Sequence, residues 1–135
     1  MVGVGLGASV LWGRPGPGPE YGESFGTNEC FKNVAGVITH VTSKDAVAPF
    51  VDGLTLQSGA TGQTYPVACS LQQPYATPLV LPSAGPSRNL FLSQAGGLTG
   101  VVPSKAAGDS WLLVVARYVA PQTFMFAPGS PVQLS

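Results

Sequence analysis

His40 is the single histidine of the chain and the first residue to consider for acid–base chemistry near neutral pH. It lies in the run 37–42, where β-branched residues dominate and predict a strand. Alternation along that strand places His40 on the same face as Ile38 and Thr42. A catalytic triad would need an aspartate as its third member, and no nucleophile-elbow sequence is present. We therefore expect His40 to be a strand-surface or interface side chain.

The carboxylates and thiols form no recognisable set. The six carboxylates are Glu20, Glu23, Glu29, Asp45, Asp52 and Asp109. A glycosidase needs two of them facing each other across a cleft, and neither that arrangement nor a calcium loop is indicated by their spacing. Cys30 and Cys69 lack the spacing of a metal-ligand cluster or a redox pair. We expect buried free thiols, with a disulfide between them left open.

A glycine-rich stretch, Gly3-Val4-Gly5-Leu6-Gly7, resembles part of a dinucleotide-binding loop. The full fingerprint requires a preceding strand, a following helix and an acidic residue about 20 positions on. Here only two residues precede the stretch, and an alternating Gly-Pro run follows it. The sequence therefore predicts that the chain is not an enzyme and that it has no catalytic residue, no cofactor and no metal.

The composition favours a folded domain that is completed by assembly. Hydrophobic residues make up 44% of the 135 residues and charged residues only 9%, with a formal net charge of zero. A disordered chain would need the opposite balance. Without a basic stripe the main source of nucleic-acid affinity is missing, and the longest apolar runs, such as 111–116, fall short of the roughly 20 residues that span a bilayer. We expect protein partners, and neither nucleic acid nor membrane.

Residues 1–26 predict an extended N-terminal arm. They contain eight glycines, some of which alternate with prolines, and this pattern excludes a helix or a central strand. The arm also carries apolar side chains, so we expect it to bind a groove on another protein; a frayed tail is the alternative. The candidate partner-binding residues are Val10, Leu11, Trp12, Arg14, Tyr21 and Phe25. Of these, Trp12 and Tyr21 are the expected anchors, and Arg14 could pair with a carboxylate.

Residues 27–135 predict an all-β domain. A hairpin is expected from 29–33 and 37–42, which flank a turn at 34–36. Further strands are expected at 51–57, 63–70, 79–81, 89–93, 98–102, 111–119, 123–126 and 132–134. Short strands at these intervals are typical of a small antiparallel β-barrel or sandwich.

The run 111–119 is nearly all apolar, as in a strand that is buried on both faces. Trp111 opens this run, and we expect it in the core. Arg117 and Tyr118 interrupt and end the run, which makes them candidates for a subunit interface.

Several turn and strand patterns carry a resemblance to a known family. Residues 51–68 read VDGLTLQSGATGQTYPVA, residues 90–99 read LFLSQAGGLT, and VPS at 102–104 and AGD at 107–109 follow. The chain then closes with a hydrophobic strand, a short turn at 120–122, the strand TFMF and Pro128. In this order of elements, residues 27–134 resemble the small phage capsid decoration (cement) and head-fibre domains.

The resemblance implies a β-barrel or tulip-like domain, often trimeric, that clamps neighbouring capsid subunits. The implied partners are the major capsid protein and further copies of the chain. The implied location is the capsid surface of the virion, after assembly in the host cytoplasm. A tail, neck or baseplate component with a receptor-binding or glycan-binding tip is the alternative, followed by a cellular binding module or a small enzyme. The N-terminal arm has no counterpart in the family pattern.

Overall fold

The computed structural model describes residues 18–71 and 73–135, and this part of the chain contains strands and no helix. The strands are β1 (Glu20–Tyr21), β2 (Cys30–Val34), β3 (Val37–His40), β4 (Gly53–Thr55), β5 (Val67–Ala68), β6 (Pro74–Ala76), β7 (Asn89–Leu92), β8 (Leu98–Thr99), β9 (Trp111–Leu112), β10 (Val114–Ala120), β11 (Thr123–Phe126) and β12 (Val132–Gln133). None of the described residues belongs to a helix that could cross a bilayer. The expectation of an all-β fold is confirmed.

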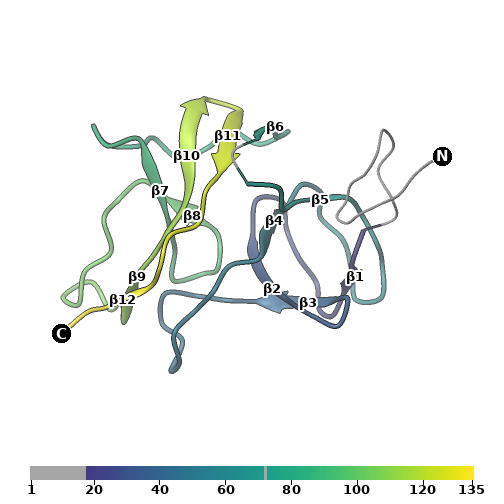
Figure 1. Cartoon of the computed structure of the whole chain (residues 1–135), viewed down its shortest axis with the longest axis horizontal. Helices are drawn as coiled ribbons and strands as arrows, with labels where there is room; N and C mark the ends of the chain where they lie inside the picture. Colours follow the sequence, from purple (N-terminus) through teal and green to yellow (C-terminus); the bar gives the residue numbers. More distant parts are fainter. Residues whose placement is uncertain (1–17, 72) are drawn as a thin grey trace.

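The first sheet has the strand order β1-β3-β2-β4-β5 and lies on the right of Figure 1. All of its pairings are antiparallel except that of β1 with β3. The sheet curls, because the bridges Glu20↔Thr64 and Phe25↔Gly59 join the segment that carries β1 to the connection between β4 and β5. Residues 18–26 therefore close the curl, and we call them the closing segment.

The second sheet has the order β6-β11-β10-β7-β8 and is antiparallel throughout. Its register shifts at two places in β10, between Val114 and Ala116 against β7 and between Tyr118 and Ala120 against β11. Such irregularities increase the local twist of a strand. β9 and β12 form a separate two-stranded sheet at the left of Figure 1.

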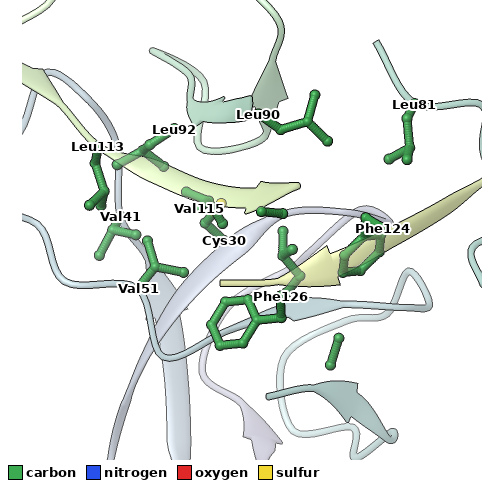
Figure 2. Packing of buried hydrophobic residues seen from close by; sticks show 13 residues of the cluster. Cys30, Val41, Val51, Leu81, Leu90, Leu92, Leu113, Val115, Phe124 and Phe126 are labelled. Atoms are coloured by element: carbon green, nitrogen blue, oxygen red, sulfur yellow. The ribbon is translucent and has the colours of Figure 1, made fainter. Parts of the chain in front are cut away.

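The main core lies between the two five-stranded sheets (Figure 2). Its buried members are Cys30, Val41, Val51, Leu54, Ala68, Leu81, Leu90, Leu92, Leu113, Val115, Ala116, Phe124 and Phe126. Full burial of each large aliphatic or aromatic side chain contributes about 1.5–3 kcal/mol. The domain therefore combines the face-to-face packing of a sandwich with a first sheet that curls as a barrel does.

A second, smaller cluster fills the curl of the first sheet, and we call it the aromatic core. It consists of Tyr21, Phe25, Phe31 and Ile38. Successive side chains of a strand point to opposite faces, so in β2 Cys30 enters the main core while Phe31 enters the aromatic core. Tyr21 and Phe31 each meet Phe25 edge to face, with ring centroids 5.2 Å and 6.5 Å apart.

Two buried polar pairs connect segments that are far apart in the sequence. The Thr77 hydroxyl, just after β6, donates to the Asn28 side-chain oxygen at 2.7 Å, just before β2. The Ser43 hydroxyl donates to the Asp109 carboxylate, which also accepts from the Ser104 amide at 3.0 Å. Because a buried polar group without a partner is costly, these pairs fix how the loops around the two sheets join.

The structure corrects the boundary of the predicted arm. The sequence placed residues 18–26 outside the domain, but this segment carries β1 and closes the first sheet. Its aromatic residues are buried by the domain itself, with Tyr21 fully buried and Phe25 4% exposed. Because this stretch is rich in glycine and proline, Tyr21 and Phe25 were not predicted as core residues. The rest of the predicted arm, 1–17, lies outside the described residues.

Three predictions about strands were also wrong. Residues 79–81 form no strand, because the Leu81 amide instead donates to the Pro121 carbonyl at 2.7 Å. β6 lies between the strands predicted at 63–70 and 79–81, where no strand was predicted. The run 111–119 is not buried on both faces, since Arg117 and Val119 are exposed, and Trp111 is only half-buried.

Candidate functional site

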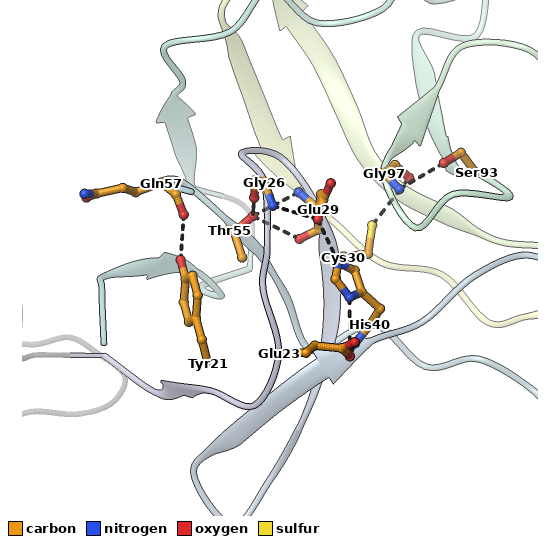
Figure 3. Close-up of polar contacts among 10 residues, drawn as sticks. All are labelled: Tyr21, Glu23, Gly26, Glu29, Cys30, His40, Thr55, Gln57, Ser93 and Gly97. Atoms are coloured by element: carbon orange, nitrogen blue, oxygen red, sulfur yellow. Dashed lines mark hydrogen bonds and ion pairs between the residues drawn. The ribbon is translucent and has the colours of Figure 1, made fainter. Parts of the chain in front are cut away.

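His40 lies between two carboxylates, those of Glu23 and Glu29 (Figure 3). Its Nε2 atom is 2.7 Å from Glu29 Oε1, and its Nδ1 atom is 3.3 Å from Glu23 Oε2. The His40 backbone amide also donates to Glu23 Oε2, at 2.7 Å. The two glutamates lie on either side of Phe25, in the closing segment and in the turn that leads into β2. We call Glu23, Glu29 and His40 the carboxylate–histidine cluster.

Packing holds the imidazole ring of His40 in place. The ring stacks on Phe25 with centroids 3.9 Å apart and an interplanar angle of 25°. On another side it meets the turn between β7 and β8, where a Cβ added to Gly96 would lie 3.3 Å from His40 Cδ2. Glu29 is fixed in turn by the Gly26 amide, which donates to its Oε1 atom at 2.8 Å. The cluster therefore joins the closing segment, β3 and the second sheet.

Only one form of the His40 ring can donate to both carboxylates. A neutral imidazole has one N–H donor, whereas imidazolium has two. Both nitrogens of His40 face carboxylate oxygens, so only the charged form can donate in both directions. The pKa of Glu23 lies below its ordinary value, chiefly because the His40 amide donates to it; desolvation opposes this effect by raising the pKa, and the His40 ring and Lys32 make smaller contributions that lower it.

The same geometry speaks against two other uses of the cluster. The two carboxylates lie against opposite nitrogens of one ring, so they cannot share a metal ion with it, and no group of three or more such residues in 18–71 and 73–135 is arranged to hold one. A hydrolase histidine activates a hydroxyl or thiol nucleophile. The ring nitrogens of His40 are instead both within reach of glutamates.

Exposed apolar side chains lie at several places in the described residues, and at two of them they are carried by loops tied to a strand or a hairpin. The first is the loop 41–52, where Val47 is 73% and Phe50 63% exposed; we call these two residues the loop apolar surface. The loop is tied to β9, because the Trp111 indole N–H donates to the Asp45 carbonyl at 2.8 Å. The Ser43 carbonyl accepts from the Trp111 amide at 3.0 Å as well. Val47 and Phe50 are therefore exposed on a loop whose base is fixed to β9.

The second place is the end of the β10–β11 hairpin. Leu79, Val80 and Val119 are all more than 40% exposed there, and we call them the turn-end apolar surface. Val119 falls in the register shift of β10, which takes it out of the ladder with β11. The loop that carries Leu79 and Val80 is held against the hairpin turn by the Gln122 side chain, which donates to the Pro78 carbonyl at 3.0 Å.

The predicted site residues have different outcomes. Val10, Leu11, Trp12 and Arg14 lie outside the described residues. Tyr21 and Phe25 were predicted to bind a partner, and this is wrong, because their side chains are enclosed in the aromatic core.

Arg117 is exposed and Tyr118 half-buried, next to the turn-end apolar surface. The Arg88 guanidinium lies 5.4 Å from the centre of the Tyr118 ring and donates to the Tyr118 and Val119 carbonyls. The predicted role of Arg117 and Tyr118 in a subunit interface stays a prediction.

Both cysteines are free, as expected, although only Cys30 is fully buried. Burial raises the pKa of the Cys30 thiol, and the nearby Glu29 carboxylate adds to the rise. Desolvation also raises the pKa of the half-buried Cys69 thiol. Since the thiolate is the reactive form of cysteine, neither environment favours nucleophilic chemistry.

The sequence did not predict that Glu23 and Glu29 contact His40. Glu23 and Glu29 lie 17 and 11 residues away from it, and no local spacing rule connects them. Comparison with known proteins found no match: no family model, no curated protein and no solved structure matches this chain.

Proposed function

We propose that this chain is a structural protein of a virus particle, a capsid decoration (cement) or head-fibre protein that binds the assembled head and stabilises it. The major capsid protein is its proposed partner, together with further copies of the chain. The proposed location is the outer surface of the capsid. The observation that carries the proposal is the amount of apolar surface that this weakly charged domain exposes.

Eleven large hydrophobic side chains of the described part are exposed, in a chain with only 9% charged residues. Exposed apolar groups that gather on anchored loops are characteristic of protein-binding surfaces. Phe50 is the one aromatic residue among the eleven, and aromatic residues contribute a large share of interface energy. Because its loop is fixed to β9, little ordering entropy is lost when it docks. The loop apolar surface is the proposed contact with the capsid.

The N-terminal sequence supports a second contact. Val10, Leu11 and Trp12 are consecutive apolar residues that precede the closing segment, and Arg14 follows them. A segment of this kind can cover a large area of a neighbouring subunit with few residues. Arg14 could form a bidentate pair with a capsid carboxylate. In this arrangement the domain is held to the shell at two points.

The resemblance of residues 27–134 to decoration and head-fibre domains supports the same role. The glycines that carry this pattern have structural uses in the fold: Gly62, Gly96 and Gly108 have φ angles of 89°, 92° and 103°. These angles suit glycine far better than other residues. The pattern thus marks the turns of a small β domain and contains no catalytic motif.

A binding experiment with shells tests the proposal. Purified empty shells of the virus that encodes the chain are mixed with the protein, and both bound protein and the melting temperature of the shell are measured. A protein that binds the assembled shell stabilises it by mass action, so we expect saturable binding and a higher melting temperature. Absence of binding by the wild-type chain would contradict the proposal.

Matched variants test the contact. Phe50→Ser is expected to weaken binding at least about thirtyfold, which corresponds to the minimum of about 2 kcal/mol for a hot-spot residue. The control is Val34→Ser, which removes an exposed valine at the opposite end of the first sheet and should bind as the wild type does. Equal loss in both variants would argue against the loop apolar surface. The copy number per particle separates a decoration protein, present in many copies, from a tail, neck or baseplate component.

A further inference from the structure

We propose that the carboxylate–histidine cluster is a proton-controlled clamp: the protonated His40 ring holds the closing segment on the first sheet, and loss of the proton loosens that segment. The clamp acts on the closing segment, which follows residues 1–17 in the sequence. It would therefore set how firmly anything attached through these residues is joined to the body of the protein. The clamp is a property of the domain and operates whatever the chain binds.

The His40 ring connects three segments of the chain. His40 belongs to β3, whereas Glu23 lies in the closing segment and Glu29 in the turn before β2. A protonated ring donates to Glu29 and forms an ion pair with Glu23, and so connects all three segments. A neutral ring keeps the hydrogen bond to Glu29 but loses the ion pair with Glu23. Charge-assisted hydrogen bonds are roughly twice as strong as neutral ones.

The His40 ring also stacks on Phe25. A cation over the face of an aromatic ring is attracted to its π electrons. The His40 and Phe25 rings are stacked at 3.9 Å, so the charged ring draws Phe25 toward the sheet as well. Phe25 belongs both to the closing segment and to the aromatic core. Loss of the charge therefore weakens two attachments of the same segment together.

Several charged and uncharged groups surround the His40 ring. From the closing segment it meets Glu23, and from the following turn Glu29. Lys32 in β2 acts on Glu23, and the Cys30 thiol lies close to Glu29. The turn between β7 and β8 presents Gly96. The two carboxylates thus attract a charged ring, and Lys32 interacts with one of them, Glu23.

The exposure of the cluster decides whether solvent can exchange the proton of the His40 ring. The His40 side chain is 24% exposed, and those of Glu29 and Glu23 are 30% and 45% exposed. Water can therefore reach the cluster without unfolding of the domain. The same exposure screens the charges and limits the strength of the clamp.

Hydrogen exchange measures the clamp directly. The amides of Gly22 and Phe25 in the closing segment donate to the carbonyls of Ile38 and Gly59. Protection factors, corrected for intrinsic exchange, are compared at about pH 5.5 and about pH 8.5, on either side of the range in which histidine changes charge. We expect these two amides to lose protection about five- to tenfold at the higher pH, as suits a partly screened charge-assisted bond. The amides of β10 and β11 should keep the same protection at both pH values.

Glu29→Gln is the matched variant, since the amide oxygen can still accept a hydrogen bond but carries no charge. Its pH-dependent loss of protection should be much smaller than that of the wild type. Equal protection of the wild type at both pH values would overturn the proposal. It would also be overturned by a parallel loss in β10 and β11, or by an unchanged loss in the variant.

A measurement on the wild type alone guards against a variant that does not fold. Nuclear magnetic resonance at the lower pH should detect a His40 Nε2–H proton that exchanges slowly because it is hydrogen-bonded to Glu29. An Nε2–H proton that exchanges as fast as that of a free histidine would overturn the proposal.

Discussion

At the scale of single residues, Tyr21 shows how the curl of the first sheet is sealed. Its ring lies edge to face against Phe25 and against Tyr65, at 5.2 Å and 5.6 Å between centroids. Its hydroxyl donates to the Gln57 carbonyl at 2.7 Å. Burial, with a smaller effect of Tyr65, raises the pKa of Tyr21 from 10.0 to about 12. One side chain therefore fills the aromatic core and also satisfies a backbone acceptor.

We predict a loss of stability in alkali that depends on Tyr21. A raised pKa means that this contribution is fully present below the unfolded value of 10.0 and is lost as the pH rises through about 12. Tyr21→Phe should lower the free energy of unfolding by about 1 kcal/mol at neutral pH, the worth of a typical hydrogen bond. The variant should lose less stability than the wild type between neutral pH and pH 11. Urea unfolding at both pH values provides the measurement, and equal losses in the two proteins would refute the prediction.

At the scale of elements, the β2–β3 hairpin has a two-residue turn. Val34 pairs with Val37, which leaves Ala35 and Gly36 as the turn, one residue shorter than the turn expected at 34–36. Their φ angles are 54° and 88°, as in the type I′ turn that matches the twist of paired strands. Glycine tolerates this conformation, whereas alanine is strained in it.

We predict that Ala35→Asn stabilises the protein. Asparagine is the preferred first residue of a type I′ turn before glycine, and it relieves part of a penalty of about 1–2 kcal/mol for a left-handed residue. The midpoint of denaturant unfolding should rise, by about 0.5–1 kcal/mol in free energy. Ala35→Val serves as the control and should lower the midpoint, because a β-branched residue fits a positive φ poorly.

The closing segment allows a prediction about truncation. Deletion of residues 2–17 should leave a folded domain, whereas deletion of residues 2–26 should not. The longer deletion removes Tyr21 and Phe25 from the aromatic core, and the loss of one buried aromatic side chain alone costs about 3–5 kcal/mol. A small domain has only about 5–15 kcal/mol of stability. Circular dichroism and thermal unfolding distinguish the two proteins, and similar melting temperatures would refute the prediction.

Local patterns identified many elements, but they could not locate contacts between distant residues. The strand at 123–126 was predicted with the bounds that the structure has, because alternation and a preceding Pro-Gln turn are both local. Tyr21 was misassigned because glycine and proline around it indicate an arm, and only its pairing with β3 shows otherwise. Glu23 and Glu29 meet His40 through the fold of the sheet, which no spacing in the sequence encodes.

At the scale of the whole molecule, charge is distributed unevenly. Residues 18–76 contain five carboxylates and two lysines, for a net charge of −3, whereas residues 77–135 contain three basic residues and one carboxylate, for a net charge of +2. The first part carries the first sheet, and the second part carries β7 to β12. Copies that meet head to tail would bring opposite charges together, as in a heterologous contact.

We predict that any self-association of the chain weakens with salt. Sedimentation at about 0.05 M and about 0.5 M salt should show smaller assemblies at the higher concentration, because the screening length shortens severalfold. Arg117→Glu, at an exposed position in the positive part, should weaken association at low salt. Lys105→Ala offers a milder comparison, since it removes a positive charge without adding a negative one. Assemblies that grow with salt would show that apolar contacts dominate.

The parallel pairing of β1 with β3 has a mechanical consequence. The Glu20 amide donates to the Gly36 carbonyl and the Gly22 amide to the Ile38 carbonyl, each at 2.8 Å. A pull on residue 18 directed along β1 would load these bonds together, in shear, and would not peel them apart one at a time. Tension on the N-terminal end would thus be passed from β1 to its neighbour β3, so that the domain resists being detached by a pull along that line.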